Sequence, residues 1–235
     1  MMSMPLPIVN GVYNPWRNQI RKQALIVQGG YPGHQPRVIA GILARILKEE
    51  NFEVEIADSL DVFLDVEKLK RMDLIVPDWT AGTITAEQLR NFTDAVQNGT
   101  GLAGVHGMGD AFRCEISYQA MVGGQFLAHP GDTGATYRVH IVDPYNPLVV
   151  GIGDFTVTTE QWYMMYDPSV QVLAATYFDH VNPPLIWRPV WMPVSWIKMY
   201  GKGRVYFNAL GHSPDILLLP QVETMVRRGM VWAAR

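Results

Sequence analysis

Hydrophobic residues in the first half of the chain fall into short runs that are separated by stretches of helical periodicity. Short apolar or alternating runs are typical of strands, whereas apolar residues that recur every three to four positions are typical of helices. Four segments are predicted strands: 23–30, 52–58, 74–79 and 101–105. Three segments are predicted helices: 37–50, the residues that follow a capping box at Thr85 and Gln88, and 111–122. This alternation predicts an α/β fold with a mostly parallel sheet and helices on both faces.

The second half of the chain, after Gly124, contains strands without helices between them. These predicted strands are 135–143, 172–179, 193–200 and 204–210. Residues 200–204 (YGKGR) predict a hairpin turn between the last two strands, and residues 220–234 predict a closing helix. We therefore predict a single domain over residues 23–235, extended by antiparallel strands in its C-terminal half and preceded by an irregular N-terminal arm at residues 1–22.

Composition removes several classes of protein. The chain has 235 residues, of which 48% are hydrophobic and 17% charged, and its net charge of −3 comes without a basic stripe, so nucleic acid is not an expected partner. No apolar run approaches the roughly 18 residues of a membrane span, and residues 1–16 do not resemble a signal peptide. We expect a cytoplasmic protein, with a homo-oligomer compatible with the sequence. The single cysteine, Cys114, excludes an internal disulfide and a cysteine-based zinc cage.

Four of the six histidines stand in loops or directly after predicted strands. They are His34, His106, His129 and His212. Because ligands of doubly wound sheets bind beyond the carboxyl ends of the strands, we expect these four to converge on one pocket. Imidazole is both a general base and the commonest metal ligand, so a divalent metal such as zinc could be held by His34, His129 and His212. Their spacing matches no tight ligand motif, and a helix cap or a hydrogen-bonded structural histidine remains the alternative for each.

His106 stands at a strand-turn-helix corner, in the segment GLAGVHGMGDAFR (101–113). Many α/β enzymes place a nucleophile at such a corner. Asp110 could orient the imidazole or cap the following helix, and Arg113 could pair with Asp110 or with Glu115. The candidate catalytic residues are therefore His106, Asp110 and Glu160.

Glu160 belongs to a second polar cluster, TTEQWYMMYDP (158–168), which is either an amphipathic strand or a sugar-binding wall of aromatic rings and carboxylates. We expect Glu160 and Tyr163 on the rim of the pocket. The candidate substrate-binding residues are His34, Asp78, Trp79, Arg113, Gln125, Gln161, Tyr163 and Trp196.

Eight motifs, taken in order from about residue 23 to the carboxyl terminus, resemble the ThuA-like (trehalose-utilization) family. They are GGYPGH, DLIVPDWTAGTIT, GLAGVHGMGDAFR, YQAMVGGQFLAHPG, EQWYMMYDP, MPVSW, YGKGRVYFNALGH and RRGMVWAA. The resemblance implies a flavodoxin-like sheet related to class I glutamine amidotransferases, in which the corner at His106 is the position of the nucleophile. A glutamine amidotransferase needs a cysteine there, and Cys114 lies eight residues further on. Thiol-dependent amide hydrolysis is therefore not expected.

The resemblance also implies a role in the catabolism of trehalose-type disaccharides, through 3-keto sugars that a partner dehydrogenase makes. A carbonyl at C3 acidifies the proton on C2, so a base could remove that proton and the substituent on C1 could leave. The leading hypothesis is a hydrolase or lyase that acts on a disaccharide or 3-keto-glycoside. The alternative is a sugar-binding or pathway-accessory protein without catalytic activity.

Overall fold

The computed structural model describes residues 21–235, so the predicted N-terminal arm falls almost entirely outside the described residues. The strands are β1 (Gln23–Gly30), β2 (Glu53–Ala57), β3 (Leu74–Thr80), β4 (Gly101–Val105), β5 (Gly124–Ala128), β6 (Thr136–Ile141), β7 (Phe155–Thr158), β8 (Tyr163–Tyr166), β9 (Gln171–Phe178), β10 (Val190–Tyr200) and β11 (Gly203–Asn208). The α-helices are α1 (Pro36–Glu49), α2 (Val66–Arg71), α3 (Ala86–Gln97), α4 (Ile116–Val122), α5 (Pro214–Leu217) and α6 (Pro220–Ala233). Short 3-10 helices cover Pro32–His34, Leu60–Leu64, His106–Gly109 and Asp132–Gly134.

One nine-stranded sheet organises the domain, in the order β2-β1-β3-β4-β11-β10-β9-β6-β7. The first five of these strands run parallel, and β10, β9, β6 and β7 extend the sheet in antiparallel fashion. The predicted hairpin turn is present, since Tyr200 pairs with Gly203 across it. The predicted fold class, a mostly parallel α/β sheet with an antiparallel C-terminal extension, is confirmed.

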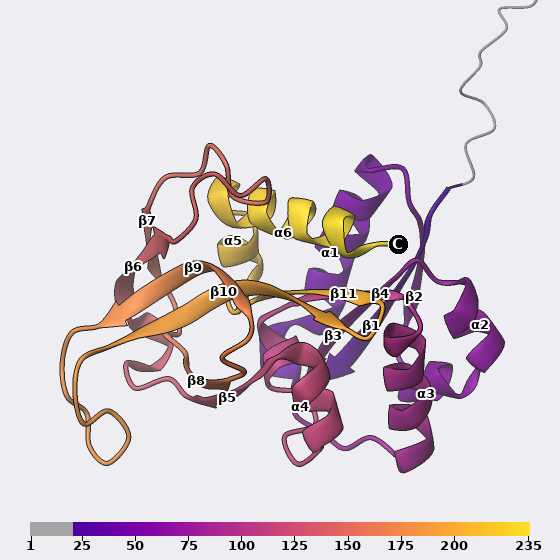
Figure 1. Ribbon diagram of the computed structural model, residues 1–235, viewed down its shortest axis with the longest axis horizontal. Coiled ribbons are helices and arrows are strands. Elements are labelled where there is room, and N and C mark those ends of the chain that lie inside the picture. Colours follow the sequence, from indigo (N-terminus) through magenta and orange to yellow (C-terminus); the bar gives the residue numbers. More distant parts are fainter. Residues whose placement is uncertain (1–20) are drawn as a thin grey trace, which may run out of the picture.

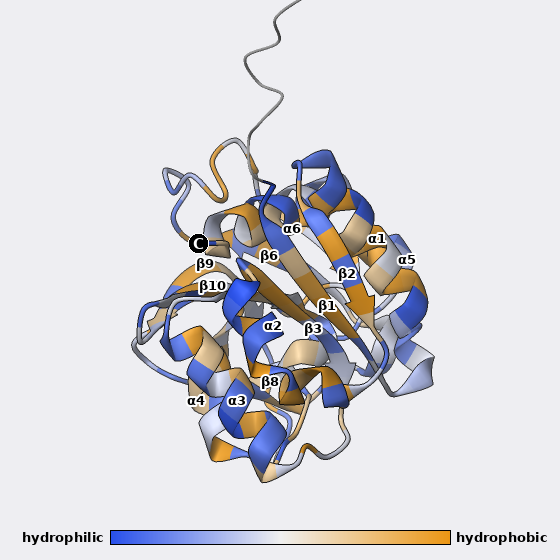
Figure 2. Ribbon diagram, turned by 90° about the vertical axis from the view of Figure 1, so that its right-hand side faces the viewer, coloured by the Kyte–Doolittle hydropathy of each residue, from blue (hydrophilic) through white to orange (hydrophobic). Residues whose placement is uncertain are grey.

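Helices cover both faces of the sheet, with α1, α5 and α6 on one side and α3 and α4 on the other (Figure 1). Side chains of β1 divide between the two resulting cores, because successive residues of a strand point to opposite faces. Ile26 packs into the core beneath α1 and α6, whereas Leu25 and Val27 pack into the core beneath α3 and α4. Burial on both faces explains why the central strands are continuously apolar, as the orange β1 and β3 show in Figure 2.

The predicted helix at 111–122 is shorter than expected, because α4 begins only at Ile116. Ala111 instead forms a parallel bridge with Ala81, and Phe112 has a left-handed backbone with φ of 48°, which a right-handed helix cannot accommodate. The predicted capping box at Thr85 is present at the start of α3. Along the described residues 21–235, no helix combines the length and the hydropathy needed to cross a bilayer.

Candidate functional site

Three parallel strands deliver histidines to the same edge of the sheet. His34 follows β1, His106 follows β4 and His212 follows β11. The centroids of the His34 and His106 rings lie 4.7 Å apart, those of His34 and His212 4.9 Å, and those of His106 and His212 5.1 Å. These three imidazoles therefore lie together at the carboxyl ends of the strands.

His106 occupies a tight corner directly after β4. Its φ of 28° is rare for a residue with a side chain, and its ring is only 2% exposed. Nδ1 lies 2.9 Å from the carbonyl oxygen of Ala209. Because a carbonyl can only accept, Nδ1 carries the hydrogen, and Nε2 of the neutral ring presents a lone pair to the site. Gly107 permits the corner, since a Cβ there would lie 2.4 Å from Oγ1 of Thr80.

The imidazole of His34 is oriented in a similar way. Nδ1 of His34 lies 2.9 Å from Oγ1 of Thr80, the last residue of β3, which leaves Nε2 of His34 available. Nδ1 of His212 lies 3.3 Å from Nε2 of His106. Hydrogen bonds that engage one ring nitrogen and leave the other available are typical of histidines that bind metals.

Glu160 completes the cluster from the connection between β7 and β8. Its Oε2 lies 3.3 Å from Nε2 of His106, and its Oε1 lies 3.4 Å from Nδ1 of His212. Trp162 donates from Nε1 to Oε2 of this carboxylate at 2.8 Å, and its ring packs 4.2 Å from that of His106. The hydroxyl of Tyr137 bonds the carbonyl oxygen of Glu160 and fixes its backbone. Glu160 is therefore a buried part of the floor, and not the rim residue that the sequence suggested.

The electrostatic environment favours neutral imidazoles around a charged carboxylate. Burial and the neighbouring rings of His106 and His212 together lower the pKa of His34 to about 4. Burial also lowers the pKa of His212. For Glu160, burial raises the pKa, but the contact with His106 and the hydrogen bond from Trp162 outweigh it and bring the pKa down to about 2. Near neutral pH, His34 and His212 thus present lone pairs to an anionic Glu160.

These four residues fit a divalent cation. One ligand atom from each of His34, His106, Glu160 and His212 lies within 4.8 Å of the other three. The separations of 3.3 to 3.4 Å equal the edges of a tetrahedron with bonds of about 2.0–2.1 Å, the usual length for zinc and imidazole nitrogen. Acceptor atoms that face one another so closely repel unless a cation or a proton lies between them. Three imidazole nitrogens and one carboxylate oxygen also suit iron, nickel and manganese.

The cluster lies against a pocket of about 510 Å³. Its lining residues are Tyr31, Gly33, His34, Thr80, Ala81, Asp110, Arg113, Phe126, His129, Thr133, Glu160, Trp162 and His212. His129 lines the pocket outside the four-residue cluster, with Nε2 3.9 Å from Oε1 of Glu160 and its ring stacked on Phe126. His106, which the sequence assigned to catalysis, takes the place in the cluster that the sequence gave to His129.

Several expected site residues lie elsewhere. Trp196 has no exposed surface and donates from Nε1 to the carbonyl oxygen of Val122. It therefore lies in the core, and the prediction that it contacts substrate is wrong. Gln161 is buried and bonded to Thr176. Tyr163 packs edge-on against Phe178 and does not line the pocket.

Residues of β3, of the segment before α4 and of β5 give the remaining corrections. Asp78 is buried within β3, and Trp79 packs against Phe112, so neither lines the pocket. Asp110 does line it but bonds Arg113 at 2.5 Å, and the carbonyl of Ala209 orients His106 in its place. Gln125 lines an adjacent hollow.

Sequence reasoning missed the roles of Trp162 and Thr80. The only signal for Trp162 was its position two residues after Glu160, which allows the indole to reach the carboxylate once the backbone between β7 and β8 is extended. Thr80 stands at the end of a strand beside the two glycines of β1, where its hydroxyl could have been expected to face the same edge. The phenyl ring of Phe126 also lines the pocket, from the strand next to β8.

Similar structures share this fold. A ThuA-like protein from Parabacteroides merdae superimposes with a TM-score of 0.73 at 18% identity, covering 91% of this chain and 90% of that one. Another from Bacteroides uniformis gives 0.72 at 18% identity, covering 95% of each chain. A glutaminase domain from Trypanosoma brucei gives 0.50 at 10% identity, covering 88% of this chain and 93% of that one. The fold is thus of the class I glutamine amidotransferase type.

A comparison with protein families also gives a match over most of the chain. Among curated protein sequences, none matches the chain. Residues 23–233 match the ThuA family, described as trehalose utilisation. The chain therefore belongs to the ThuA family, in agreement with the resemblance of its eight motifs.

Proposed function

We propose that this protein is a metal-dependent enzyme that acts on a disaccharide or 3-keto-glycoside. Membership of the ThuA family supports a role in carbohydrate metabolism. The observation that carries the proposal is the set of His34, His106, Glu160 and His212, with donor atoms turned toward one another at the floor of a sugar-sized pocket. A thiol mechanism is not available there, because none of the residues that line the pocket is a cysteine.

A divalent cation held by these residues would supply positive charge that polarises a substrate carbonyl. The surrounding residues keep the four donors in place, since Ala209 orients His106, Thr80 orients His34 and Trp162 orients Glu160. Removing such hydrogen-bond partners of metal ligands commonly weakens metal affinity by one to two orders of magnitude.

Residues at the sides of the pocket would bind and convert the sugar. Tyr31, Phe126 and Trp162 offer ring faces to the C–H surface of a pyranose. Nε2 of His129, which lies 3.9 Å from Oε1 of Glu160, would accept the C2 proton of a 3-keto-glycoside, after which the C1–oxygen bond breaks and a C1–C2 double bond forms. The departing oxygen takes the proton back from His129, so the products are an unsaturated keto sugar and a free alcohol. This step needs no oxidant and no further reactant.

The experiment is to incubate zinc-, manganese- or iron-loaded protein with 3-keto-trehalose and to measure glucose release beside the metal content. We expect one cation per chain and release of glucose, with both lost in His106→Ala and Glu160→Gln. His140→Ala is a matched control, because His140 pairs with Asp154 and does not line the pocket. Binding of the sugar without glucose release would favour the accessory role, and protein that retains no cation would refute the metal-dependent mechanism.

A further inference from the structure

A second hollow of about 370 Å³ adjoins the pocket, and Arg113 lines both. Strand β5 separates the two, since Phe126 lines the first and Gln125 lines the second. The second hollow also includes Met165 and Tyr166 of β8, which pairs with β5 in antiparallel fashion. The two hollows therefore meet at Arg113, whose side chain borders both.

We infer that the second hollow binds the sugar unit on the leaving side of the substrate, with Arg113 between the two units. The inference rests on the proposed function and assigns to Gln125 and Tyr166 a role in selecting disaccharides over glycosides with a small substituent.

Arg113 is held in position for this role. Its Nε donates to Oδ1 of Asp110, and its guanidinium lies 5.0 Å from the centre of the Phe126 ring. The side chain remains 50% exposed, and the hydrogen bonds found along residues 21–235 engage only its Nε. The two terminal nitrogens are thus available in a fixed orientation to donate to neighbouring hydroxyl or ring oxygens.

The charges of the second hollow indicate a neutral ligand. Asp110 balances Arg113, and Asp167, which lines the hollow, is paired with Lys198 at 2.9 Å. A phosphate or carboxylate would therefore meet no unbalanced positive charge.

The remaining lining is mostly apolar, with a few polar groups. Gln125 and Tyr166 offer an amide and a hydroxyl, and the exposed side chains of Ile116 and Met165 offer apolar surface. A pyranose has the same two kinds of surface, with hydroxyl groups around its rim and C–H groups on its faces. A few polar groups within a mostly apolar lining are typical of small-molecule sites.

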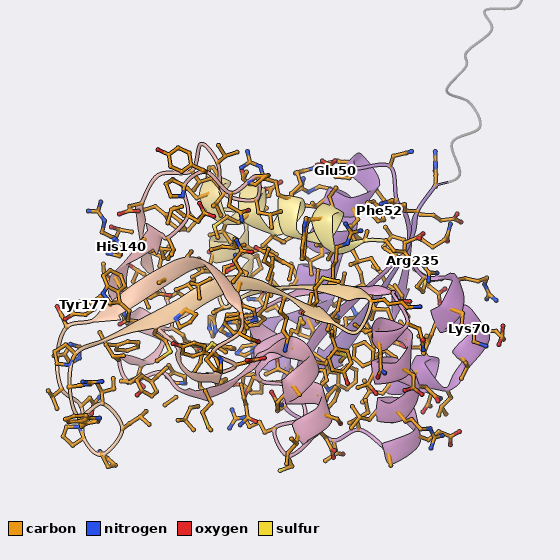
Figure 3. All side chains as sticks on the ribbon, viewed as in Figure 1. Glu50, Phe52, Lys70, His140, Tyr177 and Arg235 are labelled. Atoms are coloured by element: carbon orange, nitrogen blue, oxygen red, sulfur yellow. The ribbon has the colours of Figure 1, made fainter. Side chains whose placement is uncertain are left out.

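The test compares kcat/KM of metal-loaded protein for 3-keto-trehalose and for methyl 3-keto-α-glucoside, which fills only the first pocket. For each of Gln125→Ala and Tyr166→Ala we expect kcat/KM for the disaccharide to fall about tenfold, as for one lost ligand hydrogen bond, with the methyl glycoside unaffected. Tyr177→Ala is a matched control, because Tyr177 and Tyr166 are both 42% exposed while Tyr177 lies on β9, at the end of the sheet seen in Figure 3.

Unchanged metal content in all three variants shows that the cluster is intact. Equal losses on both substrates, or no loss on either, would overturn the second binding site while leaving the proposed function in place. Absence of turnover of both substrates by metal-loaded wild-type protein would instead refute the proposed function, and the inference with it.

Discussion

Replacing Asp78 with asparagine should remove a pH-dependent loss of stability from this protein. Asp78 lies within β3, only 7% exposed, and its Oδ2 has no hydrogen-bond partner among residues 21–235. Burial raises the pKa of this carboxyl from 3.8 to about 8, and the backbone amide of Ala40 offsets only part of the effect. Asparagine has nearly the same shape and cannot ionise, so Asp78→Asn isolates the cost of the charge.

The sign and the size follow from proton linkage. Between pH 4 and 8 the native state binds more protons at Asp78 than the unfolded state does, so the free energy of unfolding falls as the pH rises. With pKa values of 3.8 unfolded and about 8 folded, the loss between pH 5 and pH 8 is about 3–4 kcal/mol. Asp78→Asn should abolish this slope and exceed wild type in stability most clearly at the alkaline end.

The assay is urea unfolding of wild type and variant at several pH values, in the presence of a chelator that removes bound metal. Asp94→Asn serves as the control, because Asp94 is an exposed residue of α3 whose replacement should leave the slope unchanged. A slope in Asp78→Asn as steep as in wild type would refute the reasoning. The position of Asp78 in β3 argues against a contact with substrate. Loss of glucose release in Asp78→Asn, at unchanged metal content, would support that contact after all.

Three further changes probe the site and the core. Trp162→Phe should weaken metal affinity about 10- to 100-fold, because it removes an outer hydrogen bond to a ligand, and isothermal titration with zinc checks this. Gly107→Ala should also weaken zinc binding, since the new methyl group collides with Thr80, whereas Gly41→Ala, with open space around it, should bind zinc normally and gain about 0.5–1 kcal/mol. Trp196→Ala should cost about 3–5 kcal/mol in chemical unfolding while the folded fraction keeps its affinity for zinc.

The sequence predicted the central sheet well because the hydrophobic pattern of each strand and helix depends only on neighbouring residues. Apolar runs for buried strands, and the capping box at Thr85, depend on neighbouring residues alone. The same pattern placed His34, His106 and His212 after strands that end at one edge, which is why their convergence could be expected. The helix predicted from residue 111 fails for the opposite reason, since the bridge from Ala81 to Ala111 is a tertiary contact.

The finer arrangement of the site depends on contacts that residue type does not encode. Asp110 is a natural candidate to orient His106, but a backbone carbonyl takes that place, and any residue type could supply one. Trp162 stands just before β8 and Trp196 lies within β10, yet one indole bonds the carboxylate of Glu160 and the other bonds the carbonyl oxygen of Val122. Only the path of the chain between β7 and β8 decides which of them meets the pocket.

The cluster joins parts of the chain that are remote in sequence, since the contact between His106 and His212 spans 106 residues. An ion held there binds the native chain and has no comparable site in the unfolded one, so its binding energy adds directly to folding stability. At a free concentration 100 times the dissociation constant the gain is about 2.7 kcal/mol. Because β11 brings His212 to the middle of the sheet, a nascent chain would acquire this stabilisation only after its final strand has been made and inserted. Cation supply during synthesis would then set how much of the protein survives proteolysis, independently of any effect on turnover.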